Sequence, residues 1–477
     1  MAKFSKLTFP TRRNLPLVGL VVFAFLVYSI FRTQYVGGAD SYGYYSLALL
    51  LAKGKLTLPT LLDPVQFPAV APLGYMADGD RVVPTYSPGY PFLMAIASFL
   101  NLESFVTPIV GALSIVLVYA CTYHHVSRRG IALFFAAVWA FSPIVVWGST
   151  SIMSDLIASC FGLLAYYALL KDKPAISGLV IGLSLTVRPT NGLLLIIFAI
   201  PLLGTWHTLL RYVLGFGVGA IPVAVYNSLQ FGLPWKTGYG NIRDGLSGDV
   251  FLHHSAYYLR QTFRVFTPIV LLAVVPLWQN FRRYGYLAVW FVAYWVFYSF
   301  WWPGADAWWY TRFLLVGYPP LLILSAIGLE TVFDRLDRSW SGSKKFLPKL
   351  ATVLGIFMFV HFYLFSAGKA QFRIEKQSSF FNDSAKVTSI VPANSLVGTV
   401  EFSGALRLYS NLETFRWDHE SATKVIDYAQ ANQLPVYLII EPWHWEHPQL
   451  EPIKQKHQLE RVEKLSIWAD TYLHEVR

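Results

Sequence analysis

Two acidic residues in this sequence lie where apolar stretches begin or end. Asp40 follows the first apolar span, with glycines before it and three tyrosines after it, and Asp155 directly precedes the apolar span Leu156–Leu170. A carboxylate at a membrane surface can act as a general base on a hydroxyl group, while a second one can orient that group or hold a cation. Each also has a purely structural interpretation: Asp40 can help to end a membrane helix, and Asp155 can cap the start of the next one.

Two arginines are the candidate anion-binding residues. Arg312 follows a segment rich in tryptophan and opens an apolar span, and Arg188 lies in a short turn between two apolar runs. A planar guanidinium group binds phosphate oxygens through charge-assisted hydrogen bonds, which suits a lipid phosphate. Either arginine can instead snorkel to the headgroups as an anchor, an interpretation that fits Arg188 better than Arg312. Asp306 is a candidate ion-pair partner for Arg312 or for Lys236.

The sequence shows no pattern typical of a metal or nucleotide site. The pairs His124-His125 and His253-His254 are adjacent in sequence, which is not the spacing of metal ligands on a helix. His444 and His447 lie near Glu441 and Glu446; this group could bind a metal, but we favour its interpretation as solvated surface. There is no P-loop and no Rossmann glycine fingerprint. The chain therefore offers no evident place for a nucleotide-linked substrate.

Composition indicates a polytopic membrane protein. Of the 477 residues, 55% are hydrophobic and only 14% are charged, which excludes an ordinary soluble enzyme. The formal net charge is +11, but most of the excess lysine and arginine lies in short loops between apolar runs, so it does not point to nucleic acid. The two cysteines fall inside apolar spans, which argues against a disulfide framework.

The sequence predicts eleven transmembrane helices, the first of them an uncleaved span behind a basic N-terminus. The predicted spans are Leu15–Phe31, Phe105–Tyr123, Ile131–Trp147, Leu156–Leu170, Ala175–Val187, Gly192–Gly204, Tyr212–Tyr226, Phe266–Trp278, Tyr286–Trp302, Phe313–Leu329 and Leu350–Phe365. With the N-terminus in the cytoplasm, every strongly basic short loop falls on the cytoplasmic side, as the positive-inside rule requires. Asp40, Asp155, Arg188 and Arg312 then lie together on the outer side.

Two outer regions complete the predicted architecture. Residues 34–104 form a long, proline-rich first loop of ordered turns, in which Leu47–Leu51 reads as a helix on the membrane surface and Pro88–Leu100 as an interfacial or re-entrant segment. We expect residues 1–366 to form the membrane domain and 367–477 a small extracytoplasmic α/β domain. Its candidate elements are strands Leu396–Val400 and Val436–Ile440 and the helix Ala422–Ala431.

This topology constrains the substrate. Nucleotide sugars are cytoplasmic, whereas the candidate acids face outward, so an enzyme transferring a polar group there needs a donor carried in the membrane, such as a polyprenyl phosphate. Several short segments follow one another along the chain in an order that resembles the C-type (GT-C) membrane glycosyltransferases, in particular the protein-mannosyltransferase-like and aminoarabinose-transferase-like group. The segments that carry the resemblance are Gly38–Tyr42, Tyr86–Pro91, Met153–Asp155, Gly182–Asn191, Tyr226–Tyr239 and Tyr310–Pro320.

The resemblance implies roles for individual residues. Asp40 takes the place of the first-loop catalytic acid, although Ser41 stands where several relatives have a second acid. Asp155 falls where some branches bind a divalent metal, but only one acid is present here, which argues against a metal and leaves no certain cofactor. Arg312 corresponds to a contact with the donor phosphate. The remaining substrate-binding candidates are Arg188, Tyr86, Lys236, Tyr239 and Asp306.

The resemblance therefore predicts an inverting transfer of sugar from a polyprenyl-phosphate donor to a hydroxyl of a protein, lipid or glycan, in the cell (inner) membrane, with Asp40 as general base. Two alternatives remain open on the sequence. A transporter or lipid flippase would carry ionisable groups near the membrane midplane on broken helices, whereas the candidates here gather at the outer ends. A ligase-type enzyme using a diphosphate-linked glycan would depend on arginines more than on an acid.

Overall fold

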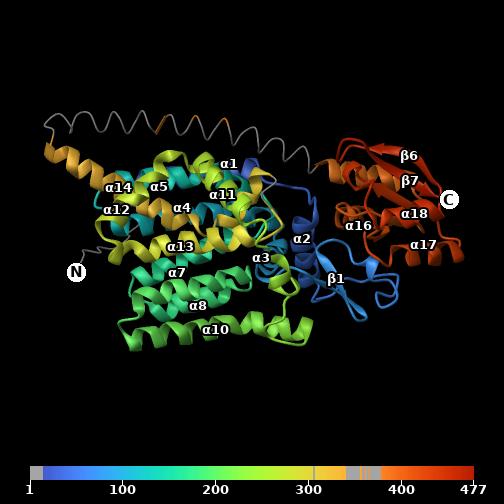
Figure 1. The fold of residues 1–477 in the computed structure, drawn as a ribbon, viewed down its shortest axis with the longest axis horizontal. Coiled ribbons are helices and arrows are strands. Elements are labelled where there is room, and N and C mark those ends of the chain that lie inside the picture. The colour runs from blue at the N-terminus through green and yellow to red at the C-terminus, as the bar shows by residue number, and fades with distance from the viewer. Residues whose placement is uncertain (1–13, 305–306, 340–354, 357–359, 361–363, 365–377) are drawn as a thin grey trace.

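The computed structural model describes residues 14–304, 307–339, 355–356, 360, 364 and 378–477. A bundle of helices occupies one end of the elongated molecule and a small sheet domain the other, with the first outer loop between them (Figure 1). The helices of the bundle are α1 Leu15–Ile30, α4 Val106–His125, α5 Arg129–Phe141, α6 Pro143–Thr150, α7 Asp155–Leu170, α8 Pro174–Ser184, α9 Leu193–Ala199, α10 Trp206–Phe231, α11 Phe251–Phe266, α12 Val274–Gln279, α13 Phe281–Phe300 and α14 Tyr318–Ser339.

Several helices of the bundle are bent where a proline interrupts them. The bend is 59° between α5 and α6, at Pro143, and 106° between α11 and the following short helix, at Pro268. Proline lacks the N–H of a helical hydrogen bond and disfavours helical geometry in the residue before it. The helix α14 is likewise bent by 83° from the 3-10 helix η8 (Trp308–Leu314), ahead of Pro319. These breaks leave non-helical backbone at the ends of the bundle, where side chains can converge.

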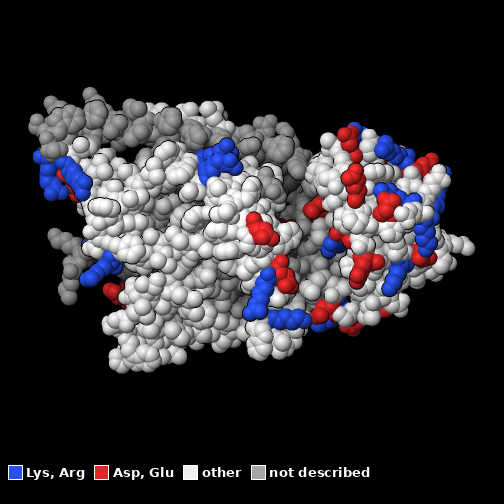
Figure 2. Space-filling model, viewed as in Figure 1, with Lys and Arg blue, Asp and Glu red and all other residues white. Residues whose placement is uncertain are grey.

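The predicted spans coincide with these helices. The first ten of the eleven predicted apolar runs fall on helices, and the eleventh, Leu350–Phe365, lies largely outside the described residues. By length and composition alone, two described helices can cross a membrane, or up to five when each bent pair counts as one span. Figure 2 shows few charged side chains over the helical bundle and many over the sheet domain. The chain is an α-helical polytopic membrane protein with a small sheet domain at its C-terminal end.

Helix α8 packs closely against α10, and this packing fixes the end of α8. The turn that carries Arg188 comes next in the chain. Both helices carry glycines four residues apart, Gly178 and Gly182 on α8 and Gly215 and Gly219 on α10. A Cβ at Gly219 would lie only 2.2 Å from the carbonyl oxygen of Leu179, so the two backbones are in direct contact. Small residues at this spacing are the usual means by which membrane helices approach closely.

The first outer loop is more regular than the sequence predicted. It contains α2 (Ala39–Ala52), a hairpin of β1 (Tyr75–Asp78) and β2 (Arg81–Pro84), and α3 (Gly89–Ser98). The sequence correctly placed a short helix after Asp40, but that helix begins at Ala39, so Asp40 lies in its first turn. A carboxylate there is stabilised by the free N–H groups of the helix start.

The sheet domain is built on five strands in the order β4-β3-β5-β7-β6. Strand β3 runs parallel to β4 and β5, and β7 is antiparallel to β5 and β6. The elements are β3 Leu396–Gly398, α16 Ser403–Ser410, β4 Glu413–Phe415, α17 Ala422–Ala431, β5 Val436–Ile440, α18 Leu450–Lys456, β6 Leu459–Leu465 and β7 Thr471–Val476. The residues predicted for β5 and α17 match the observed elements.

This domain docks on the first outer loop. The backbone N–H of Arg416 donates to the carbonyl of Ala69 at 2.7 Å, and that of Leu73 donates to the hydroxyl of Ser403 at 3.1 Å. Helix α16 lies beside α2 (Figure 1). The loops that follow β3 and β4 are therefore held close to the start of α2, which carries Asp40.

Candidate active site

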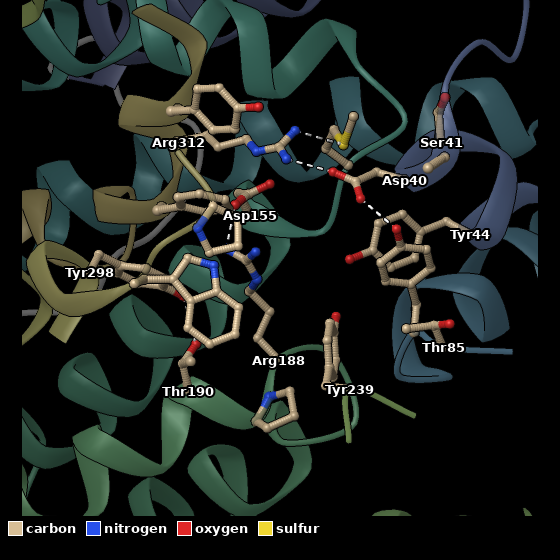
Figure 3. Close-up of a pocket in the computed structure, with 18 of the residues that line it drawn as sticks. Asp40, Ser41, Tyr44, Thr85, Asp155, Arg188, Thr190, Tyr239, Tyr298 and Arg312 are labelled. Carbon is tan, nitrogen blue, oxygen red and sulfur yellow. Dashed lines mark hydrogen bonds and ion pairs between the residues drawn. The ribbon is translucent and has the colours of Figure 1, made fainter. Parts of the chain in front are cut away.

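A cavity of about 520 Å³ lies where the outer loop, the bundle and the sheet domain meet. Its walls come from the start of α2, the segment after β2, the start of α7, the turn after α8, the end of α13, and η8 (Figure 3). The sheet domain contributes Glu401. Segments far apart in the sequence thus supply side chains to one space.

Asp40 is held from two sides. One carboxylate oxygen accepts a hydrogen bond from the Tyr86 hydroxyl at 2.5 Å. The other pairs with Nη2 of Arg312, also at 2.5 Å (Figure 3). The side chain of Arg312 is 10% exposed and that of Asp40 is 32% exposed. The carboxylate therefore keeps access to the cavity, while the arginine lies in the wall behind it.

A second acid–arginine pair lies beside the first. Asp155 begins α7 and pairs with Nη1 of Arg188, and both side chains are largely buried. The guanidinium of Arg188 also lies over the ring of Phe313, 5.5 Å from its centre. Asp155 is close enough to Arg312, and Arg188 to Asp40, for electrostatic attraction between the pairs. The four charges therefore alternate and neutralise one another, which permits their burial.

Arg312 retains unused hydrogen-bond donors. Its Nη2 binds Asp40, its Nη1 faces the sulfur of Met153 at 3.4 Å, and its Nε is buried with no partner among the described residues. The guanidinium lies 5.1 Å from the ring centre of Phe313, which holds its plane by cation–π contact. Arg312 lines the cavity, and its guanidinium group has five N–H groups, more than Asp40 and Met153 use, so it can also bind an acceptor oxygen there.

The electrostatic environment keeps Asp40 ionised. Burial raises the pKa of Asp40, but the charge of Arg312 and the hydrogen bonds from Tyr86 and Arg312 together outweigh it, so the pKa lies below its ordinary value. Burial, reinforced by the charge of Asp40, raises the pKa of Tyr86 well above its usual range. The phenol is therefore a permanent donor and the carboxylate a permanent acceptor at neutral pH.

The position of Tyr86 depends on the absence of a side chain at Gly43. A Cβ at Gly43 would lie 2.3 Å from two carbon atoms of the Tyr86 ring, so only glycine lets this ring lie flat against α2. Tyr44, one residue on, stacks near Tyr86 at 4.7 Å between ring centres, and its hydroxyl is 2.7 Å from that of Ser154. The same helix thus positions Asp40, supports the tyrosine that orients it, and contacts the residue before Asp155.

The structure gathers most of the predicted site residues in this cavity. Those that line it are Asp40, Asp155, Arg188, Arg312, Tyr86 and Tyr239. Lys236 is exposed and is not among the lining residues, and Asp306 lies outside the described residues. Among the described residues Arg312 pairs with Asp40, and the predicted pairing of Asp306 with Arg312 or Lys236 falls on a residue outside them.

The polar lining residues that were not predicted as site residues include Thr190, Tyr298 and Glu401. Thr190 and Tyr298 are 3.1 Å apart at their hydroxyls. Of the residues expected to form solvated surface near His444, Glu446 is exposed as predicted, whereas Glu441 and His444 differ from that expectation. Glu441 is fully buried and His444 is partly buried, because the end of β5 packs under the ring of Trp417. Among the described residues, no three histidine, cysteine, aspartate or glutamate side chains come together in a way that could hold a metal ion.

Comparison with solved structures gives matches along nearly the whole chain. ArnT from Cupriavidus metallidurans bound to undecaprenyl phosphate superimposes with a TM-score of 0.65 at 13% identity, covering 97% of this chain and 98% of ArnT. The archaeal oligosaccharyltransferase AglB from Archaeoglobus fulgidus, in complex with an inhibitory peptide and a dolichol-phosphate, gives 0.60 at 12% identity over 90% of this chain and 69% of AglB. The protein has the fold of the C-type membrane glycosyltransferases.

The GT-C fold predicted from the ordered sequence segments is therefore confirmed. Apo ArnT gives the same result, with a TM-score of 0.64 at 13% identity over 98% of each chain. No protein-family model and no curated protein matches the sequence. At this level of identity the likeness establishes the fold, so the activity has to be argued from the residues in the cavity.

Proposed function

We propose that this protein is an integral membrane glycosyltransferase that moves a sugar from a polyprenyl-phosphate donor to an acceptor hydroxyl on the outer face of the membrane. The observation that carries the proposal is the pairing of Asp40 with Arg312 in the wall of the cavity. A base beside a buried phosphate-binding group, in a GT-C fold, is what such a transfer needs. The structural neighbours named with undecaprenyl phosphate and dolichol-phosphate support the same donor class.

The proposed reaction is a single inverting displacement. The acceptor hydroxyl gives its proton to Asp40 while its oxygen attacks the anomeric carbon of the donor sugar. The bond between that carbon and the phosphate oxygen breaks, and the lipid phosphate leaves with the electron pair. Arg312 and Arg188, which both line the cavity, then stabilise the charge that develops on the phosphate. The hydrogen bond from Tyr86 holds the carboxylate in place during the transfer.

Binding of the donor also prepares the base. In the structure Arg312 shares its charge with Asp40, and a carboxylate in an ion pair is a weak proton acceptor. A phosphate on the same guanidinium competes for that charge and lets the pKa of Asp40 rise toward its ordinary value. Deprotonation of the acceptor thus becomes favourable only when the donor is in place. Asp155 is occupied by Arg188, so we propose that it aligns this arginine and that the transfer needs no divalent metal.

The orientation in the membrane is part of the proposal. With the N-terminus in the cytoplasm, the cavity and the domain of residues 367–477 lie on the extracytoplasmic side, as the distribution of basic loops requires. The Lys236 loop, exposed beside Tyr239, then faces the same side. This orientation is tested by labelling an introduced cysteine at the exposed Lys236 with a membrane-impermeant maleimide.

The donor class is tested by measuring binding of undecaprenyl phosphate to the purified protein through tryptophan fluorescence. We expect Arg312→Gln to weaken binding at least tenfold, because a charge-assisted hydrogen bond to phosphate is lost. Arg243→Gln, an exposed arginine outside the cavity, serves as the control and should bind like the wild type. Absence of binding by the wild type, or equal binding by both variants, would contradict the proposed donor site.

A further inference from the structure

The sheet domain places one carboxyl group in the cavity. Glu401 follows β3, which ends at Gly398, and its side chain lines the cavity wall. Its Oε2 lies 3.9 Å from the position that a Cβ on Gly38 would occupy, so it lies over the start of α2, near Asp40. None of the described residues forms a hydrogen bond with this carboxyl group. The sheet domain, which is otherwise remote from the bundle, thus reaches the cavity near Asp40 through the side chain of Glu401.

A second acid, Glu441, supports Glu401 from the neighbouring strand. Glu441 follows β5, which pairs in parallel with β3, so both acids lie at the carboxyl ends of adjacent parallel strands. Ligands bind at this edge in open α/β sheets. Glu441 is fully buried, its Oε2 is 3.1 Å from Nδ1 of His444, and its Oε1 has no partner among the described residues. Burial, and then the charges of Glu441 and Asp40, raise the pKa of Glu401.

The charges divide the cavity surroundings into two regions. Arg188 and Arg312 come from the bundle, and they suit the donor phosphate. In the region supplied by the sheet domain, Arg416 is bound on two nitrogens by Asp418 at 2.9 and 2.5 Å, and His444 is bound by Glu441 at 3.1 Å. An acceptor that brought a phosphate or carboxylate to this region would meet Glu401, while the neighbouring Arg416 and His444 are already paired with other acids. An acceptor that brought hydroxyl or amino groups would find unused acceptors.

We propose that Glu401, supported by Glu441, forms the acceptor subsite and selects a neutral or amine-bearing polyol, such as a sugar unit, over a phosphorylated one. This inference rests on the proposed transferase function and adds the chemistry of the acceptor to it. Glu401 accepts hydrogen bonds from the groups that flank the reacting hydroxyl. That hydroxyl is thereby held against Asp40, while the donor phosphate occupies the arginine side.

The test compares the wild type with Glu401→Gln and, as a matched control, with Glu446→Gln, an exposed glutamate of the same domain. Membrane extract of the source cells serves as acceptor and their radiolabelled polyprenyl-phosphate sugars serve as donor. We expect Glu401→Gln to need roughly tenfold more extract for half-maximal transfer, the usual cost of one charged hydrogen bond. Its KM for the donor and its affinity for undecaprenyl phosphate should stay within about twofold of the wild type, which also shows that it folds.

Two soluble probes then examine the preferred charge. Glucosamine should inhibit the wild type competitively against the extract and lose this effect in Glu401→Gln, whereas glucosamine 6-phosphate should compete more weakly. Stronger competition by the phosphate, an unchanged requirement for extract in Glu401→Gln, or an equal loss of donor affinity would each overturn the acceptor subsite. So would a wild type that binds undecaprenyl phosphate but labels nothing in the extract. A wild type that neither binds nor transfers would instead refute the transferase function itself.

Discussion

Removal of the Asp40 charge is expected to make the protein bind its donor lipid more tightly while destroying its activity. In Asp40→Asn the side chain keeps its size and its hydrogen bond with Tyr86, but Arg312 loses its ionic partner. A phosphate entering the cavity then no longer competes with a carboxylate for the guanidinium. It is also no longer repelled by that carboxylate, which is ionised in the wild type because its pKa is lowered.

The size of the gain follows from the separation of the charges. Two unit charges about 4 Å apart interact by about 4 kcal/mol at an effective dielectric constant of about 20. The side chain of Asp40 is 32% exposed, so solvent screening reduces this figure, and we take about half of it. A change of about 2 kcal/mol corresponds to binding roughly 30-fold tighter. This outcome differs in sign from that of Arg312→Gln, which should weaken binding.

The assay is titration of purified protein with undecaprenyl phosphate, followed by tryptophan fluorescence, since Trp147 lies 5.6 Å from the guanidinium of Arg312. Asp249→Asn, an exposed acid in the loop before α11, is the matched control and should bind like the wild type. Weaker binding by Asp40→Asn, or the same shift in Asp249→Asn, would refute the view that Asp40 and the donor phosphate share Arg312.

Three further results follow from the structure. Gly43→Ala should displace the ring of Tyr86 and destabilise the protein by about 1–3 kcal/mol through overpacking, with a clear fall in transfer rate. Arg188→Gln should be strongly destabilising, by about 3–5 kcal/mol, because it leaves the buried carboxylate of Asp155 without a partner. The transfer rate should stay level between about pH 5 and pH 8. The pKa of Asp40 is lower in the folded protein than its ordinary value of 3.8. The ionised carboxylate therefore stabilises the folded protein fully above about pH 3.8, and this stabilisation is lost as the pH falls through the pKa of Asp40 in the folded protein.

Thermal unfolding in detergent and pH–rate profiles check these results. Gly130→Ala and Arg243→Gln are suitable controls, because a Cβ at Gly130 meets nothing within 4 Å and Arg243 is exposed. A stable, fully active Gly43→Ala variant would show that the position of Tyr86 is unimportant. An acid limb of the rate near pH 6 would point to a base other than Asp40.

Sequence reasoning succeeded where a local pattern determines the structure. Apolar length and the distribution of basic loops located the helices, and the alternation of apolar strands with an amphipathic segment located β5 and α17. The same patterns placed Asp40 and Asp155 at the ends of apolar stretches, where the structure has them at the starts of α2 and α7.

The pairing of the site residues could not be predicted in this way. Asp40 and Arg312 are 272 residues apart, and only the tertiary fold brings them together. Glu401 carried no signal of its own, because it is an isolated acid after a short strand and enters the cavity only through the docking of the sheet domain on the outer loop. Lys236 follows a segment that matches the family pattern, yet its side chain is exposed. Long-range contacts of this kind leave no periodicity in a single sequence.

In the proposed reaction Asp40 is the base of a polyprenyl-phosphate-dependent sugar transfer. The most direct measurement is transfer of radiolabelled sugar from polyprenyl-phosphate donors to acceptors in membranes that carry equal amounts of the wild type or Asp40→Asn. We expect transfer by the wild type and a loss of at least about 100-fold in the variant, the usual contribution of a general base, although the variant binds undecaprenyl phosphate at least as well. Equal transfer by both proteins would show that Asp40 is not the base.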